Sequence, residues 1–153
     1  MKTIWVDMDG VIADFDYAKS QWKGSSNQFF KHMIDTHGFA NLEILPCEKL
    51  MNRLEEIRES HGVKIKILSS YGRPENLSVR DDKEKWLSRF PFRFDEVVFV
   101  PGKEYKRNYA TPDSILIDDT PSNVFDFIDA GGLAILHKSQ KNTINYLDKI
   151  FGM

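Results

Sequence analysis

The sequence predicts an α/β fold with a doubly wound, parallel sheet of five strands. Short apolar runs alternate along the chain with amphipathic helical patterns, as in proteins built from β-α-β units. Each run is continuously apolar, which is typical of strands that are buried on both faces. At 153 residues the chain is long enough for one such domain with a small insertion.

The five strands are expected where β-branched and other apolar residues cluster between turn signals. They cover residues 3–6, 63–68, 97–100, 115–117 and 133–136. The first strand begins almost at the first residue, and we therefore expect it at the centre of the sheet.

Helices are expected where N-cap residues, a proline in the first turn or a closing glycine mark their ends. They cover 25–38, 46–62, 81–90, 103–110, 121–128 and 139–150. Asp81 and Asp82 mark the start of the third of these helices. Residues 14–44 are rich in aromatic and polar side chains. We expect them to form a small helical cap, inserted after the first strand into a core domain of residues 1–13 and 45–153.

Polar residues directly follow three of the predicted strands. In open parallel sheets, ligands bind at the carboxyl ends of the strands, where the strand order reverses. Three separate segments are therefore expected to meet at one rim and to carry the chemistry. They are Asp7, Met8 and Asp9 after the first strand, Ser69 and Ser70 after the second, and Asp118 and Asp119 after the fourth.

These segments carry three motifs, D-M-D-G-V at 7–11, I-L-S-S at 67–70 and I-L-I-D-D at 115–119. In this order they resemble the motifs of the haloacid dehalogenase-like (HAD) phosphatase superfamily: Asp-x-Asp-x-(Thr/Val), a Ser or Thr that ends a strand, and a later acidic pair. The resemblance implies a Rossmann-like HAD core and hydrolysis of a phosphomonoester through an aspartyl-phosphate. Any one of these residues alone could be an ordinary N-cap or turn residue, whereas the three motifs together indicate the family.

The resemblance also implies a role for each motif residue. Asp7 would be the nucleophile, because a carboxylate can attack phosphorus once the charge of the phosphate is neutralised. Mg²⁺ would neutralise that charge, held by the Asp7 carboxylate, the Asp9 backbone carbonyl and the Asp118–Asp119 pair, of which either member could bind directly. Asp9 would be the general acid and then the general base, since crowded carboxylates favour one that holds a proton. Ser69 would donate a hydrogen bond to a phosphoryl oxygen.

The superfamily also uses a lysine beside the nucleophile, and two lysines lie in the right place. Lys103 and Lys106 both fall between the third and fourth strands, in G-K-E-Y-K-R-N-Y-A. The spacing to Asp118 favours Lys106 as the catalytic lysine and leaves Lys103 as a candidate for substrate binding. Either could instead be a solvated surface lysine.

Within the superfamily, D-M-D-G-V-I-A-D-F at 7–15 is similar to the start of the 5′(3′)-deoxyribonucleotidases. That similarity implies a nucleoside monophosphate as substrate and a cap whose aromatic side chains cover the base. Phe15 and Trp22 are candidates for the base, and Ser70 and Arg73 for the phosphate or sugar. The same aromatic residues could form the core of the cap. A sugar phosphate or a nucleic-acid 3′-phosphate is the alternative substrate.

A protein of another class, the receiver-type phosphoacceptor signalling domain, also has a doubly wound sheet with aspartates at strand ends. It would place its acidic pair after the first strand and its phosphoacceptor after the third. Here the first strand carries Asp-x-Asp and the acidic pair follows the fourth, so this class is disfavoured.

The composition limits partners and location. A net charge of -2 argues against an extended nucleic-acid surface, which would need a basic excess. The single cysteine, Cys47, fits a reducing compartment. No secretory signal is visible, and no stretch approaches the ~18 apolar residues that span a membrane. We therefore expect a cytoplasmic protein that acts on a small phosphorylated molecule.

Overall fold

The computed structural model describes residues 1–72 and 76–153, which form one sheet of five parallel strands in the order β3-β2-β1-β4-β5. The strands are β1 (Thr3–Val6), β2 (Lys64–Ser70), β3 (Glu96–Val100), β4 (Ser114–Asp118) and β5 (Leu133–Leu136). The doubly wound α/β fold predicted from the sequence is confirmed, and each strand lies within two residues of its expected position.

The first strand is central, as its early start predicts. β1 pairs with β2, where Thr3 lies opposite Lys64, and with β4, where Thr3 lies opposite Ser114. The chain builds one half of the sheet through β2 and β3 and then returns to the other side of β1. The strand order reverses between β1 and β4, so the carboxyl ends of these two strands flank the crevice where such sheets bind ligands.

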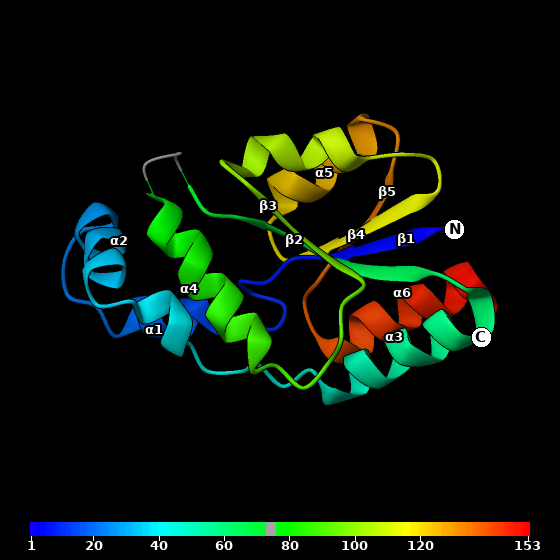
Figure 1. Ribbon diagram of the computed structural model, residues 1–153. Coiled ribbons are helices and arrows are strands. Elements are labelled where there is room, and N and C mark those ends of the chain that lie inside the picture. The colour runs from blue at the N-terminus through cyan, green and yellow to red at the C-terminus, as the bar shows by residue number, and fades with distance from the viewer. Residues whose placement is uncertain (73–75) are drawn as a thin grey trace.

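Helices cover both faces of the sheet (Figure 1). On one face α3 (Glu48–His61) packs against α6 (Gln140–Phe151), and on the other α5 (Pro121–Asp129) packs against the 3₁₀ segment η3 (Lys103–Tyr109). The remaining helices gather at the end of the sheet opposite the N-terminus (Figure 1). They are α1 (Phe15–Ser20), α2 (Ser26–Asp35), the 3₁₀ segment η1 (Gly38–Asn41) and α4 (Leu77–Ser88).

The central strand shows why the sheet needs cover on both sides. Ile4 and Val6 belong to the apolar cluster beneath α3 and α6, whereas Trp5 belongs to the cluster beneath α5. Successive side chains of a strand point to opposite faces, so a fully apolar strand is stable only between two layers.

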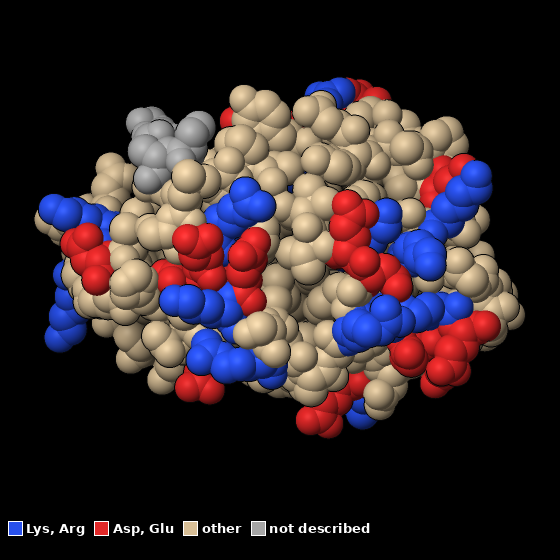
Figure 2. Space-filling view, viewed as in Figure 1, with Lys and Arg blue, Asp and Glu red and all other residues tan. Residues whose placement is uncertain are grey.

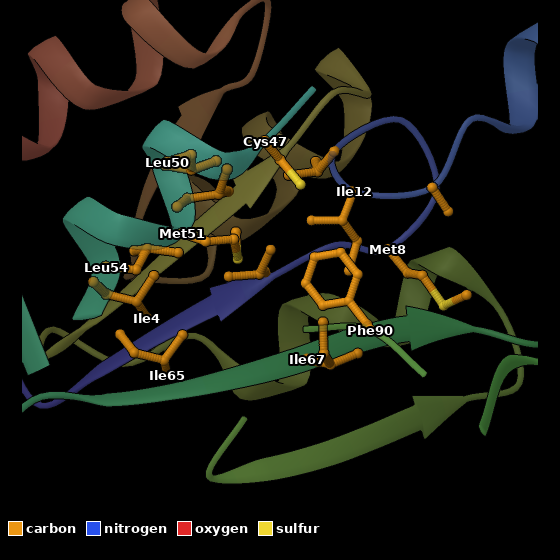
Figure 3. Packing of buried hydrophobic residues seen from close by; sticks show 14 of the residues in the cluster. Ile4, Met8, Ile12, Cys47, Leu50, Met51, Leu54, Ile65, Ile67 and Phe90 are labelled. Atoms are coloured by element: carbon orange, nitrogen blue, oxygen red, sulfur yellow. The ribbon is translucent and has the colours of Figure 1, made fainter. Parts of the chain in front are cut away.

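The burial of Met8 determines the direction in which the side chains of Asp7 and Asp9 point. Met8, just beyond β1, is fully buried in the cluster on the α3 side, part of which is drawn in Figure 3. Because neighbouring side chains of an extended segment point in opposite directions, Asp7 and Asp9 turn away from that cluster. The D-M-D sequence therefore places two carboxylates at the rim while its middle residue anchors the loop.

The insertion after β1 leaves and returns at one point of the core. Ala13 and Ile44 pair in an antiparallel bridge, and α1, α2 and η1 lie between them. Phe29, Met33 and Phe39 from this insertion belong to the same apolar cluster as the strands. The insertion thus shares a core with the sheet, and its standing as a separate cap domain stays a prediction.

The insertion, which we call the cap, rests on α4. Trp86 Nε1 donates a hydrogen bond of 2.7 Å to the Leu42 carbonyl, and His37 Nδ1 lies 3.1 Å from Asp82 Oδ1. Trp86 and Asp82 are both buried. These contacts attach the end of the cap to a helix of the core.

Besides the end of α4, which lies at Ser88 rather than at Phe90, three helix ends differ from the prediction by two residues or more. α2 ends at Asp35 rather than at Gly38, because the chain turns at His37 in a left-handed conformation (φ 55°). The second predicted helix starts later than Pro46, since α3 begins at Glu48.

The third difference matters for the site. α4 begins at Leu77 rather than at Asp81. Val79 is the buried apolar residue of the first turn, but the positions three and four residues later are Asp82 and Lys83, so no apolar periodicity in the sequence marks this end of the helix. The earlier start places Asp82 and Lys83 in the second turn, and both are buried.

The surface carries mixed charge. On the face in Figure 2, Lys and Arg side chains lie beside Asp and Glu side chains rather than in a field of one sign. On α4, for example, Arg80 Nε lies 3.6 Å from Glu84 Oε1. Within the part of the chain that the structure describes, no helix combines the length and the apolar character needed to cross a membrane.

Candidate active site

A buried lysine joins β1 and β4 at their carboxyl ends. Lys106, from η3, donates hydrogen bonds to Asp7 Oδ1 at 2.8 Å and to Asp118 Oδ2 at 2.9 Å. Its side chain is only 3% exposed, so both ion pairs are shielded from solvent. Lys103, the other lysine left open by the sequence, is exposed on the same segment. The geometry therefore favours Lys106 as the lysine beside the predicted nucleophile.

Asp118 is held in one orientation by three donors. Besides Lys106, the Asn123 side chain donates to Oδ2 at 3.1 Å, and the Thr120 backbone N–H donates to Oδ1 at 2.9 Å. Asn123 is a buried residue of α5 that the sequence analysis did not identify. Its position in the first turn of the helix that follows the acidic pair could have indicated that Asn123 belongs to the site.

Three carboxylates come close enough to share a cation. Asp7, Asp118 and Asp119 each offer an oxygen, and these oxygens lie within 4.8 Å of one another. Mg²⁺ prefers such oxygen ligands. Gly10 lets the loop after β1 approach Asp119, because its φ is +85° and a Cβ there would lie 1.9 Å from Asp119 Oδ2.

Burial and neighbouring carboxylates raise the pKa of two carboxyl groups of the site. Burial raises the pKa of Asp7 well above its usual value; Lys106 opposes this rise, and Asp118 adds to it. Burial, Asp118 and Asp16 together raise the pKa of Asp119 to about 6. Burial alone would lower the pKa of Lys106, but its attraction to Asp7 and Asp118 outweighs burial and raises it. More positive charge would stabilise the ionised carboxylates.

A second buried lysine connects the motif at 7–11 with the motif at 67–70. Lys83, from α4, donates hydrogen bonds to Asp9 Oδ2 at 2.9 Å, to Ser69 Oγ at 3.0 Å and to the Ser70 carbonyl at 2.7 Å. It is only 2% exposed. Lys83 was not predicted as a site residue, because it stands in a charged run that has the pattern of a solvated helix face.

The charges of the site fit a divalent cation. Four carboxylates face two ammonium groups, so the ionised set carries a net charge of -2. A Mg²⁺ ion would balance that charge, and the three clustered carboxylates provide its ligands. The six side chains are Asp7, Asp9, Asp118, Asp119, Lys83 and Lys106.

Two of the residues predicted to read the substrate, Phe15 and Trp22, pack against other aromatic rings of the insertion. The Phe15 ring stacks on Phe39 with centroids 5.8 Å apart, and the Trp22 ring stacks on His32 at 4.9 Å. Both rings thus pack within the cap. Arg73 lies outside the described residues. Contacts of Phe15, Trp22, Ser70, Arg73 and Lys103 with a substrate stay predictions.

Comparison with known proteins relates the fold to solved structures. No family model and no curated protein matches the sequence. A HAD family enzyme from Bacteroides thetaiotaomicron, solved with magnesium and inorganic phosphate, matches with a TM-score of 0.55 and 16% identity, over 90% of this chain and 94% of that one.

Two other solved structures match over the whole chain. A hydrolase from Streptococcus pneumoniae matches with a TM-score of 0.53 and 15% identity, over 100% of both chains. The L-2-haloacid dehalogenase from Xanthobacter autotrophicus matches with a TM-score of 0.53 and 13% identity, over 100% of this chain and 84% of that one. At such identities the similarity shows a shared fold, so the chain has the α/β fold of HAD enzymes.

Substitution of Gly10 should distinguish a specific loss of Mg²⁺ binding from the loss of stability that backbone strain alone would cause. A Cβ at Gly10 would displace the Asp119 carboxylate, so Gly10→Ala should weaken Mg²⁺ binding at least about tenfold by titration calorimetry. Gly62→Ala is the matched control, because Gly62 also has a positive φ (+66°) but open space around its Cβ position. It should lose only about 1 kcal/mol of stability and keep its Mg²⁺ affinity. Equal Mg²⁺ affinity in the two variants would contradict the assignment of Asp119.

Removal of Lys106 should destabilise the fold in the absence of metal. Lys106→Met leaves two buried carboxylates without their shared cation, and we expect the free energy of unfolding to fall by about 3 kcal/mol in magnesium-free buffer. Lys103→Met removes an exposed lysine of the same segment and should change it by less than about 0.5 kcal/mol. Urea denaturation measures both values, and equal stability of the two variants would refute the compensating role of Lys106.

Proposed function

We propose that the protein is a Mg²⁺-dependent phosphomonoester hydrolase of the HAD type that acts through an aspartyl-phosphate on Asp7. The observation that carries this proposal is the meeting of Asp7, Asp9 and the Asp118–Asp119 pair at one rim, around two buried lysines. The motif resemblance and the shared HAD fold support it.

The ligands of the ion would be the carboxylates of Asp7 and of the Asp118–Asp119 pair, with the Asp9 carbonyl as the resemblance implies. When bound, Mg²⁺ neutralises charge on the phosphate. An Asp7 oxygen attacks phosphorus, and the bond from phosphorus to the leaving oxygen breaks. Ser69 donates a hydrogen bond to a phosphoryl oxygen, and Lys106 steadies the nucleophile.

Asp9 moves the protons of both steps. It gives a proton to the leaving alcohol in the first step, which leaves its carboxylate ready as a base. In the second step it takes a proton from a water molecule, and the resulting hydroxide attacks the phosphorus of the aspartyl-phosphate. Inorganic phosphate leaves, and Asp7 and Asp9 return to their starting forms.

Dehalogenation is the alternative reaction to consider, because a dehalogenase shares this fold. A halide leaves without a proton, and displacement of a halide from carbon creates no phosphoryl charge to neutralise. Asp9 would then have no leaving group to protonate, and the acidic pair would have no cation to hold. Their presence at the rim favours phosphoryl chemistry over carbon–halogen chemistry.

The proposed substrate is a nucleoside monophosphate, as for a 5′(3′)-deoxyribonucleotidase. The support is the similarity of residues 7–15 to those enzymes, together with a cap that contains several aromatic residues. The stacking of Phe15 and Trp22 within the cap favours a second candidate, a sugar phosphate, because stacked rings have fewer faces to offer a base.

The wild-type protein should hydrolyse p-nitrophenyl phosphate only with Mg²⁺, and chelation followed by added Mg²⁺ should remove and restore the activity. Asp7→Asn should lower the rate by on the order of 10² to 10⁴ or more, because the nucleophile is lost. Asp129→Asn, at an exposed aspartate of α5, is the control and should keep full activity. Turnover that survives thorough chelation, or an Asp7→Asn enzyme within about threefold of wild type, would contradict the mechanism.

A substrate panel should test the nucleotidase hypothesis. If the cap reads a base, deoxynucleoside monophosphates should exceed glycerol phosphate in kcat/KM by roughly five- to 150-fold, the effect of ~1–3 kcal/mol of stacking. Trp22→Ala should then remove most of that preference and spare p-nitrophenyl phosphate. Phe125→Ala, at an exposed ring on α5, is the matched control. Equal rates on glycerol phosphate and nucleotides would mean that the nucleotidase hypothesis is wrong and leave the phosphatase proposal standing.

A further inference from the structure

Lys83 uses its full hydrogen-bonding capacity inside the site. Its side chain is 3% exposed, and its ammonium group donates to Asp9 Oδ2, Ser69 Oγ and the Ser70 carbonyl at 2.7–3.0 Å. An ammonium group has three N–H donors, so these three acceptors satisfy it completely. A buried cation bound on three sides holds its partners in fixed relative positions.

The contact with Lys83 distinguishes the two oxygens of Asp9. Oδ2 is bound to Lys83, whereas Oδ1 is buried and meets no hydrogen-bond partner within residues 1–72 and 76–153. Leaving a buried acceptor unpaired costs free energy, so such an atom in a site calls for a ligand that completes it. Oδ1 is therefore the oxygen available to a leaving group or to water.

We propose that Lys83 is a positioning residue, which holds the Asp9 carboxylate in the rotation that presents Oδ1 to the substrate. This inference rests on the proposed phosphatase reaction. Lys83 acts through Asp9 and does not take part in the proton transfers. Both transfers of Asp9, to the leaving oxygen and from the attacking water, require hydrogen-bond distance. A carboxylate free to rotate would meet that requirement less often.

The helix that carries Lys83 also carries the cap. Asp82, its neighbour in sequence, lies 3.1 Å from His37 Nδ1 at the end of the cap. The Phe39 ring, also from the cap, has its centroid 5.5 Å from Lys83 Nζ. The same turn of α4 therefore holds the cap on one side and Asp9 on the other. A shift of the cap relative to α4 would therefore move Lys83 and change the orientation of the Asp9 carboxylate.

The dependence of rate on the leaving group tests this role. p-Nitrophenolate leaves without a proton, whereas the alkoxide of an alkyl phosphate needs one, so a disoriented Asp9 slows the alkyl ester selectively. Lys83→Met should lower kcat/KM for an alkyl phosphate at least about tenfold more than for p-nitrophenyl phosphate, and Asp9→Asn should show the same selectivity. Lys85→Met, at an exposed lysine of the same helix, should change neither value.

A double-mutant cycle isolates the coupling of Lys83 with Asp9. In the Asp9→Asn background, Lys83→Met should cost less than about threefold, because no carboxylate is left to position. His37→Ala changes a side chain that is 64% exposed, so this variant should fold. It should lower kcat/KM for the alkyl phosphate selectively, but less than Lys83→Met does. It therefore tests the proposal even if Lys83→Met does not fold.

The outcomes separate the two proposals. Equal losses on both esters, losses that multiply in the double variant, or no selective loss in His37→Ala would overturn the positioning role of Lys83. A wild-type protein that hydrolyses neither ester in the presence of Mg²⁺ would overturn the proposed function instead.

Discussion

Compensation of buried negative charge at the ends of β1 and β4 is the constraint on which the rest of the site depends. Moving an ion from water into the protein interior costs several kcal/mol of free energy unless an opposite charge and hydrogen bonds replace the lost water. Asp7 is 6% exposed and Asp118 is 0% exposed, on neighbouring strands, and Lys106 lies between them. The packing of η3 against α5 brings that lysine over the strand ends. The loop between β3 and β4 is thus as much a part of the site as the strands themselves.

A second compensation works from the opposite side. Lys83 balances Asp9, and it comes from α4, the helix on which the cap rests. The charges of the site are therefore matched by two lysines from two different layers of the fold. One layer is tied to the sheet through α5, and the other is tied to the cap. Asp7, Asp118 and Asp119 have only Lys106 among them, and these three carboxylates cluster closely enough to bind a cation.

The strands and the acidic residues could be predicted from the sequence because their signals are local. Asp7, Asp9 and the Asp118–Asp119 pair directly follow apolar runs, and the parallel sheet brings those ends together. The fully buried Met8 then decides which way the first two carboxylates point. None of this requires knowledge of distant contacts.

Lys83 could not be predicted in the same way, and Lys106 is favoured over Lys103 only by its spacing to Asp118. Lys83 stands in the charged run R-D-D-K-E-K, which has the pattern of a solvated helix face, and only the docking of the cap and the position of Asp9 bury it. Lys103 and Lys106 are three residues apart in a 3₁₀ segment, where residues at that spacing eclipse each other, so periodicity places both on one side. The fold distinguishes the two lysines, because it leaves Lys103 exposed and brings Lys106 to Asp7 and Asp118 at the strand ends.

The shared fold does not decide the reaction, because solved structures with this fold include a dehalogenase as well as an enzyme that binds magnesium and phosphate. The charge of the site is the more informative quantity. A phosphate monoester is itself an anion, and the carboxylates of the rim, which outnumber its two lysines, repel it before any cation has bound. On the proposed function, the acidic pair therefore implies an order of binding, with the metal ion before the phosphate. Lys83 and Lys106 are each already engaged by carboxylates, so the ion, rather than a free lysine, makes the rim attractive to the substrate.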